Sequence, residues 1–265
     1  NNQKISAVQI EGFHQKDGVI MIDYLKEFED KGFFTCADIL NESEREELLS
    51  NIDQIERNVL THPENKKEMD PNNTSRLRKI NDLTLNHQYF FEISKKTEIL
   101  NVIEKCIGPD IKLFGDQLFM KPPGGVEKTS HQDSPYFPIS PMNLITCWIA
   151  LEDVTEENGC MKFIPGSHQL GALPHSEKWM VGNREDMRIP KDLIQDKDEV
   201  SICLKAGSAS FHHSLLVHRS GSNNSPHSRK GWAIHYMSSK SKWTNSDDLK
   251  PNFPLLRGAS HPDCV

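Results

Sequence analysis

The chain has 265 residues, of which 36% are hydrophobic and 26% are charged, as in an ordinary globular protein. Its 31 Lys and Arg against 38 Asp and Glu give a formal net charge of −7, which argues against nucleic acid as the main partner. The longest apolar run, around 144–151, is too short to span a bilayer. We therefore expect neither a nucleic-acid nor a membrane partner.

Six cysteines occur, and no two of them form a CxxC pair. A chain of this length does not need disulfides for stability, so we expect free thiols in a reducing compartment. The opening residues Asn1–Ser6 lack the features of a signal peptide. We expect an intracellular protein, located in the cytoplasm unless an organelle-targeting segment precedes Asn1.

The first 110 residues or so read as mainly helical. Residues 19–31 predict a strand followed by a short helix. Asn41 and Glu44 form a capping-box pattern, which predicts a helix start. The polar stretch 62–74 reads as a loop, and 88–107 reads as a helical stretch ended by Gly-Pro. We expect this part to support the rest of the chain.

After residue 110 the pattern changes to short apolar or alternating runs bounded by Gly, Pro and Asn. The predicted strands are 111–120, 144–151, 161–164, 200–204, 208–212 and 231–237. Many short strands predict a sandwich or barrel, with the helices packed outside it. We therefore expect one domain over 1–265, mainly β with flanking helices, whose β-core spans about 111–240. Two long connections, 134–143 and 168–199, are predicted to be lids or binding loops.

The most informative residues are His131, Asp133 and His218. A histidine and a carboxylate two positions apart on a strand project from one face. A second histidine from a distant strand would complete the 2-His-1-carboxylate set of non-haem Fe(II) oxygenases. Arg229, eleven residues past His218, is a candidate anchor for the far carboxylate of a 2-oxo acid cosubstrate. Ser220 lies two residues from His218 and is a candidate hydroxyl donor.

Other histidines have simpler interpretations. His212 and His213 are adjacent, so on a strand one packs inward and the other faces solvent. We expect neither to be a metal ligand. His168 follows a Pro-Gly-Ser turn and is expected to make structural hydrogen bonds. His235 is expected to be a hydrogen-bonded strand residue near the core.

These motifs resemble the phytanoyl-CoA dioxygenase family of Fe(II)- and 2-oxoglutarate-dependent oxygenases, over roughly 75–236. The residues that carry the resemblance are Met120-Lys121-Pro122-Pro123, His131-Gln132-Asp133, Tyr136-Phe137-Pro138, Asn158-Gly159-Cys160, Ile164–His168 and Val217–Gly221 with Arg229. The resemblance implies a double-stranded β-helix, that is, a cupin-like jelly-roll. It also implies Fe(II), 2-oxoglutarate and O₂ as cofactor and cosubstrates, with succinate and CO₂ released.

The resemblance also implies roles for individual residues. His131, Asp133 and His218 would be the iron ligands, and Arg229 would anchor 2-oxoglutarate. By looser alignment, Lys79, Gln117, Trp148 and Ser220 match positions that contact the cosubstrate, although Gln117 stands where an apolar residue is expected. Related iron halogenases carry a small residue in place of Asp133. The carboxylate therefore favours hydroxylation, or desaturation or cyclisation, over halogenation.

The substrate is expected to be a small organic molecule. Tyr136 and Phe137 are predicted to shape its pocket, and Lys178, Arg184 or Arg188 to contact an anionic group on it. Two other functions use similar residues. One is a zinc-dependent hydrolase, although zinc prefers tetrahedral sites and has no need of Arg229. The other is a non-catalytic jelly-roll module that binds a small molecule.

Overall fold

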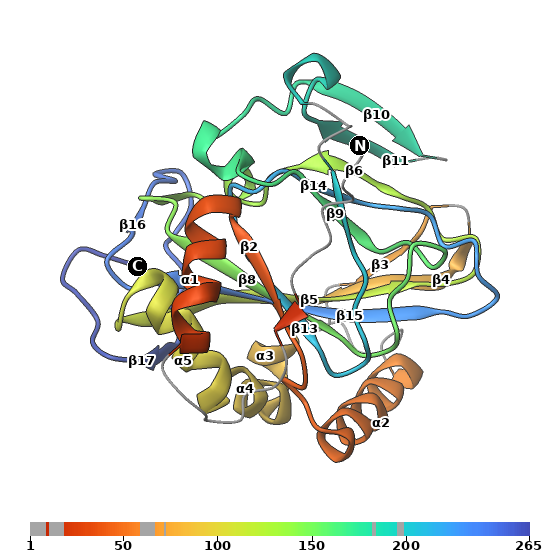
Figure 1. The fold of residues 1–265 in the computed structure, drawn as a ribbon, viewed down its shortest axis with the longest axis horizontal. Helices are drawn as coiled ribbons and strands as arrows, with labels where there is room; N and C mark the ends of the chain where they lie inside the picture. The colour runs from red at the N-terminus through yellow and green to blue at the C-terminus, as the bar shows by residue number, and fades with distance from the viewer. Residues whose placement is uncertain (1–8, 11–18, 59–66, 72, 182–183, 195–198) are drawn as a thin grey trace.

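The computed structural model describes residues 9–10, 19–58, 67–71, 73–181, 184–194 and 199–265. Two antiparallel sheets form a jelly-roll, and most helices lie on the outer side of the larger sheet (Figure 1). The predicted fold class, a jelly-roll core with flanking helices, is confirmed. The functional pocket described below lies on the inner side of the larger sheet.

The larger sheet runs in the order β1-β2-β13-β8-β15-β5-β4-β3, and β17 pairs with β5. Only β1 and β2 are parallel among its described pairs. The strands are β1 (Gln9–Ile10), β2 (Phe33–Cys36), β3 (Lys67–Asp70), β4 (Asn73–Asn81), β5 (Ile111–Lys121), β8 (Leu144–Ala150), β13 (Ala209–His213), β15 (Arg229–Ser238) and β17 (Leu255–Arg257).

The smaller sheet runs in the order β12-β9-β14-β6 and is antiparallel. Its strands are β6 (Lys128–His131), β9 (Met161–Phe163), β12 (Val200–Ile202) and β14 (His218–Ser220). Two more strand pairs lie apart from both sheets: β7 (Ile139–Ser140) with β16 (Lys242–Trp243), and β10 (Glu177–Val181) with β11 (Arg184–Arg188). Short 3₁₀ turns are η1 (Ser134–Tyr136), η2 (Ser167–Leu170) and η3 (Lys191–Leu193).

The helices precede β5 in the chain. They are α1 (Val19–Lys31), α2 (Glu42–Asn58), α3 (Leu83–Asn86), α4 (Gln88–Ser94) and α5 (Thr97–Ile107). The predicted capping box begins α2: the Asn41 amide donates to Glu44 Oε2 at 2.8 Å, and the Glu44 amide donates to Asn41 Oδ1 at 3.0 Å. Helix α5 packs against β5, β8 and β15. The main apolar core therefore lies between these helices and the larger sheet.

Strand β15 shows how alternation divides the larger sheet into two faces. Trp232, Ile234 and Tyr236 are buried in the main apolar cluster with the helices. The Trp232 indole N–H donates to Asp116 Oδ2 at 2.8 Å, and its ring meets Phe90 edge-on at 5.4 Å. The intervening residues of β15 point to the other face, toward the smaller sheet. Loss of a fully buried side chain such as Trp232 typically costs about 3–5 kcal/mol.

Two local predictions were wrong. Residues 19–22 were predicted to be a strand but begin α1, a helix that buries Tyr24 and Phe28 in the main core. The stretch 62–74 was predicted to be a loop; residues 62–66 and 72 lie outside the described residues, but β3 lies within the rest and β4 begins there. β3 is polar because it is the edge strand of the sheet, where fewer side chains are covered, and β4 lies next to it. The larger sheet therefore also takes strands from the part predicted to be helical.

The connection 168–199 is also more ordered than a loop, because it carries the β10–β11 hairpin. No helix within the described residues is long and apolar enough to cross a membrane. All six cysteines are unpaired.

Candidate active site

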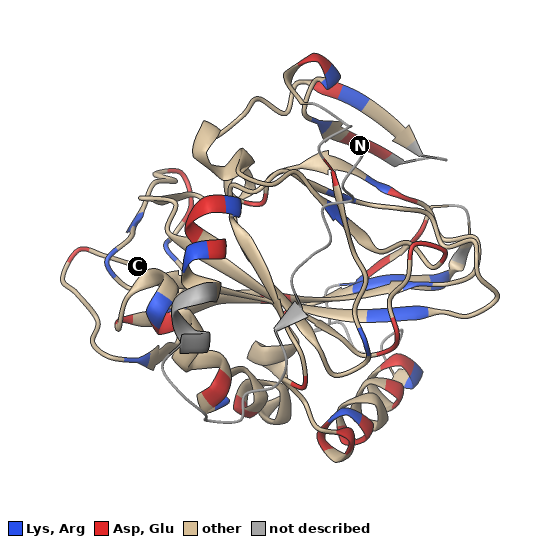
Figure 2. Cartoon of the chain, in the orientation of Figure 1, with Lys and Arg blue, Asp and Glu red and all other residues tan. Residues whose placement is uncertain are grey.

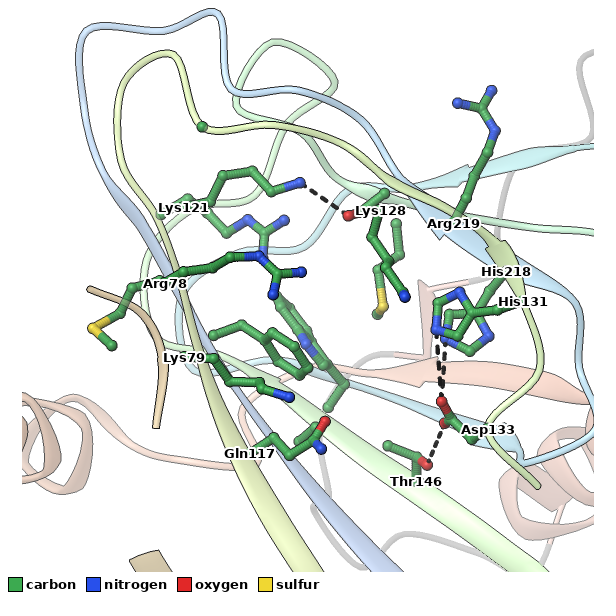
Figure 3. Close-up of a pocket in the computed structure, with 18 of the residues that line it drawn as sticks. Arg78, Lys79, Gln117, Lys121, Lys128, His131, Asp133, Thr146, His218 and Arg219 are labelled. Atoms are coloured by element: carbon green, nitrogen blue, oxygen red, sulfur yellow. Dashed lines mark hydrogen bonds and ion pairs between the residues drawn. The ribbon is translucent and has the colours of Figure 1, made fainter. Parts of the chain in front are cut away.

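The smaller sheet and the turn after β6 bring His131, Asp133 and His218 together (Figure 3). His131 ends β6, and His218 begins the neighbouring β14 as its direct partner in the antiparallel register. Asp133 follows His131 in the turn into η1. One ligand atom from each residue lies within 4.8 Å of the others. Asp133 Oδ1 lies 3.8 Å from His131 Nε2 and 3.7 Å from His218 Nε2.

Backbone carbonyls set the tautomer of both histidines. His131 Nδ1 lies 2.8 Å from the Thr129 carbonyl, and His218 Nδ1 lies 3.0 Å from the Leu216 carbonyl. A carbonyl only accepts, so each Nδ1 carries the proton and each Nε2 presents a lone pair toward Asp133. Metal-binding histidines are commonly fixed in this way. The three residues thus fit an Fe(II) ion that takes two neutral imidazoles and one carboxylate.

Asp133 is held by its own contacts. Its amide donates to the Ser214 carbonyl at 2.9 Å, and Thr146 Oγ1 donates to its Oδ2 at 3.3 Å. Burial alone would raise the Asp133 pKa. The interactions with the neighbouring His218 and His212 outweigh burial and hold that pKa well below its usual value. The group is therefore a carboxylate, the form that binds a metal.

Two further histidines, His212 and His235, lie closer to this site than the sequence suggested. Both line the pocket, and burial lowers both pKa values, that of His235 to about 4. His212 Nε2 lies 3.8 Å from Asp133 Oδ2. His235 Nδ1 lies 2.9 Å from Thr146 Oγ1, which is already a donor to Asp133. The Thr146 hydroxyl has one proton, so it accepts from His235 Nδ1–H.

The pocket beside the triad has a volume of about 320 Å³. Its walls come from β4, β5, β8 and β15 of the larger sheet and from β6 and β14 of the smaller one. Many of the lining residues alternate along their strands, as one face of a sheet requires. They include Gln117, Phe119 and Lys121 on β5, Thr146 and Trp148 on β8, and Arg229, Ala233 and His235 on β15.

Arg229 lies deep in this pocket and is only 2% exposed. Its Nη2 donates to the Gly159 carbonyl at 2.5 Å, and its guanidinium lies 5.3 Å from the Trp148 ring centroid. A Cβ at Gly231 would lie 2.0 Å from that indole, so glycine is needed where the ring crosses β15. Burial lowers the Arg229 pKa from 12.5 to about 10. The group remains a cation at neutral pH.

The other expected cosubstrate contacts, Lys79, Gln117, Trp148 and Ser220, all line the same pocket. Lys79 lies on β4 and its Nζ is 2.5 Å from Glu68 Oε1. Gln117 on β5 lies opposite Ala233 of β15. Ser220 Oγ accepts a hydrogen bond of 2.9 Å from Lys121 Nζ. The structure thus places these four residues together.

The expected substrate contacts are only partly in the pocket. Tyr136 and Phe137 line it, whereas Lys178 and Arg188 do not. Both lie on the β10–β11 hairpin, where Lys178 pairs with Glu185 at 3.1 Å and Arg188 pairs with Glu177 at 3.0 Å. Arg184 begins β11, and its side chain lies outside the described part. Lys178 and Arg188 therefore already have acidic partners on the hairpin, and their contact with a substrate stays a prediction.

Four basic residues that sequence reasoning did not assign to the site line the pocket instead. They are Arg78, Lys121, Lys128 and Arg219 (Figure 3). Period-two alternation from Gln117 along β5 could have found Lys121. The positions of Arg78 and Lys128 depend on how distant strands pair, which no local pattern reveals.

Comparison with known proteins agrees with this site. The family model described as phytanoyl-CoA dioxygenase (PhyH) matches residues 28–231. The chain belongs to the phytanoyl-CoA dioxygenase family. It is therefore an Fe(II)- and 2-oxoglutarate-dependent oxygenase, the function predicted from its sequence. Membership disfavours the zinc hydrolase and the non-catalytic module, which share neither the cosubstrate nor the reaction.

Curated relatives cover most of the chain. It is 29% identical to the peroxisomal phytanoyl-CoA dioxygenase of Rattus norvegicus over 242 residues, which are 86% of this chain and 71% of the relative. It is 37% identical to the phytanoyl-CoA dioxygenase of Arabidopsis thaliana over 131 residues, 49% of this chain and 46% of the relative.

Solved structures share the fold. EctD from S. alaskensis, in its apoform, superposes with a TM-score of 0.73 at 17% identity, covering 98% of this chain and 91% of that one. The epimerase SnoN, solved with Fe³⁺, alpha ketoglutarate and a nogalamycin compound, superposes with a TM-score of 0.72 at 22% identity. That match covers 91% of this chain and 100% of SnoN.

Proposed function

We propose that the chain works as a single oxygenase domain that hydroxylates an anionic small molecule. His131, Asp133 and His218 hold Fe(II), and Arg229 anchors the distal carboxylate of 2-oxoglutarate. Bound iron, with 2-oxoglutarate and O₂, supplies the oxidant that breaks a C–H bond, with release of succinate and CO₂. Desaturation or cyclisation would use the same oxidant. The unpaired cysteines support an intracellular location, and the rat relative is named as peroxisomal.

The charge of the pocket carries the proposal of an anionic substrate. Six lining residues are cations and three are carboxylates, although the whole chain is acidic. Figure 2 shows basic residues gathered along β4 and at the start of β15. The six cations are Arg78, Lys79, Lys121, Lys128, Arg219 and Arg229, and the three acids are Asp70, Asp133 and Asp186. One of those acids, Asp133, is assigned to the metal, so the remaining lining residues carry a larger excess of positive charge.

Three of these cations are suited to a substrate at the rim of the pocket. Arg219, which follows His218 in the chain, is held in place by two hydrogen bonds of 2.5 Å to Glu199. Lys128 pairs with Asp186, and Arg78 lies 2.7 Å from Glu68. Fixed cations lose little entropy when they bind an anion, and they orient it. The curated relatives are named for phytanoyl-CoA, an acyl-CoA whose phosphates are anionic.

A screen of succinate release tests this proposal. Each candidate acid is compared with its neutral ester or amide, and one acyl-CoA is included. The substrate that is found is then assayed with Lys128→Met and with the matched control Lys178→Met, whose side chain is 72% exposed on the hairpin. We expect Lys128→Met to raise the substrate KM about tenfold without changing the KM for 2-oxoglutarate. We expect Lys178→Met to change neither. A preference for neutral substrates would overturn the anionic assignment.

A further inference from the structure

Two cations of the pocket, the buried Arg229 and the half-buried Lys121, face each other across neighbouring strands. Lys121 ends β5 and Arg229 begins β15, and the two are direct partners in the antiparallel register. Side chains at such positions lie on the same face of the sheet and within contact range. Like charges placed directly opposite each other destabilise a sheet. This pairing therefore needs a physical reason.

Neither cation is neutralised by a carboxylate. Arg229 Nη2 donates to a carbonyl, and its buried Nε has no hydrogen-bond partner. Lys121 Nζ donates to Ser220 Oγ at 2.9 Å and to the Gly221 carbonyl. Within the described residues, neither forms an ion pair, unlike Lys79 and Lys128, which each pair with an acid.

Such an arrangement is costly in the free protein. Burial and the charge of Arg229 lower the Lys121 pKa well below its ordinary value. An uncompensated buried charge is strongly unfavourable unless a partner arrives. The two cations therefore form a preorganised receptor for an anion, with a hydroxyl from Ser220 at its edge.

We propose that Lys121 is the second cation of the 2-oxoglutarate anchor. One oxygen of the distal carboxylate binds Arg229, and the other binds Lys121, with Ser220 donating between them. This inference rests on the proposed role of Arg229 as the anchor. It also separates two groups of cations. Arg78, Lys128 and Arg219 have acidic partners and are proposed to serve the substrate, whereas Lys121 and Arg229 form no ion pair within the described residues and are proposed to serve the cosubstrate.

The test measures cosubstrate binding without turnover. Fe(II)-loaded protein is titrated anaerobically with 2-oxoglutarate and with 2-oxopentanoate, which lacks the distal carboxylate, and the visible charge-transfer absorption is recorded. We expect Lys121→Met to weaken 2-oxoglutarate binding about tenfold or more and to leave 2-oxopentanoate binding unchanged. Lys121→Arg should restore most of the affinity. Lys205→Met, which removes an exposed lysine, should have no effect.

Lys121→Gln is the second variant, because its amide still donates to the Gly221 carbonyl and preserves the fold if methionine does not. An equal loss for both ligands would show that Lys121 only shapes the pocket, and unchanged 2-oxoglutarate affinity would show that Arg229 acts alone. Either result would overturn the inference. Failure of the wild-type protein to bind 2-oxoglutarate would instead overturn the proposed function.

Discussion

Arg229→Met tests whether the buried arginine serves a ligand or the fold. The side chain makes one hydrogen bond and one ring contact, and its Nε has no partner. A hydrogen bond to a charged group is worth about 1.5–3 kcal/mol. Loss of the bond to the distal carboxylate should therefore weaken 2-oxoglutarate binding about ten- to a hundredfold, at about 1.4 kcal/mol for each factor of ten.

The same substitution should leave the cofactor-free protein nearly as stable. The Arg229 pKa falls from 12.5 to about 10 on burial, which corresponds to about 3 kcal/mol of unfavourable desolvation of the charged form. Methionine removes this cost. It also loses the bond to Gly159, about 1.5–3 kcal/mol, and the contact with Trp148, about 0.5–2 kcal/mol. These contributions largely cancel, so we expect the free energy of unfolding to fall by no more than about 2 kcal/mol.

The assays are an anaerobic 2-oxoglutarate titration and urea unfolding of the metal-free protein. A structural cation with its own acidic partner would behave differently, because breaking a buried ion pair costs about 3–5 kcal/mol. A loss of stability of that size, or an unchanged affinity for 2-oxoglutarate, would refute the reasoning.

Three other perturbations follow from the site and its surroundings. His218→Ala should abolish Fe(II) binding in a metal titration, and wild-type iron affinity in this variant would remove His218 from the ligand set. Thr146→Val loses the hydrogen bond to Asp133 and should weaken Fe(II) binding about tenfold to a hundredfold, whereas Thr146→Ser should bind nearly normally; equal affinities in both variants would contradict a positioning role. Burial lowers the His213 pKa from 6.5 to about 4, so its contribution to stability is complete above pH 6.5 and is lost as the pH falls toward 4. In urea unfolding, this group should lower the free energy of unfolding by up to about 1.4 kcal/mol for each pH unit of acidification. The same dependence of that free energy on pH in His213→Gln would show that His213 does not contribute.

Much of the fold could be predicted from local patterns. The capping box at Asn41 marked the start of α2, and the alternation around Trp232 marked β15. The failure at residues 19–22 has a physical cause. The apolar run at 19–22 suits a strand as well as a helix. Packing of the segment against β2 decides in favour of the helix. The edge strand β3 was missed because a polar strand has no apolar alternation to detect.

The candidate site, like the fold, could be predicted from the sequence only in part. His131 and Asp133 are close in sequence, so their spacing alone suggested a metal site. The basic residues that line the pocket, such as Lys128, could not be identified locally, whereas Lys178 lies on a hairpin where it pairs with Glu185. The Thr146 bridge to Asp133 joins strands far apart in the chain and leaves no local sequence signal.

The most direct test of the central claim is the absorption of the Fe(II)-loaded wild-type protein on anaerobic addition of 2-oxoglutarate. We expect a weak visible charge-transfer band that saturates at one 2-oxoglutarate per chain, because the cosubstrate chelates iron held by His131, Asp133 and His218. The zinc-loaded protein should show no such band. Saturating iron binding without a band would contradict the assignment of this pocket to Fe(II) and 2-oxoglutarate.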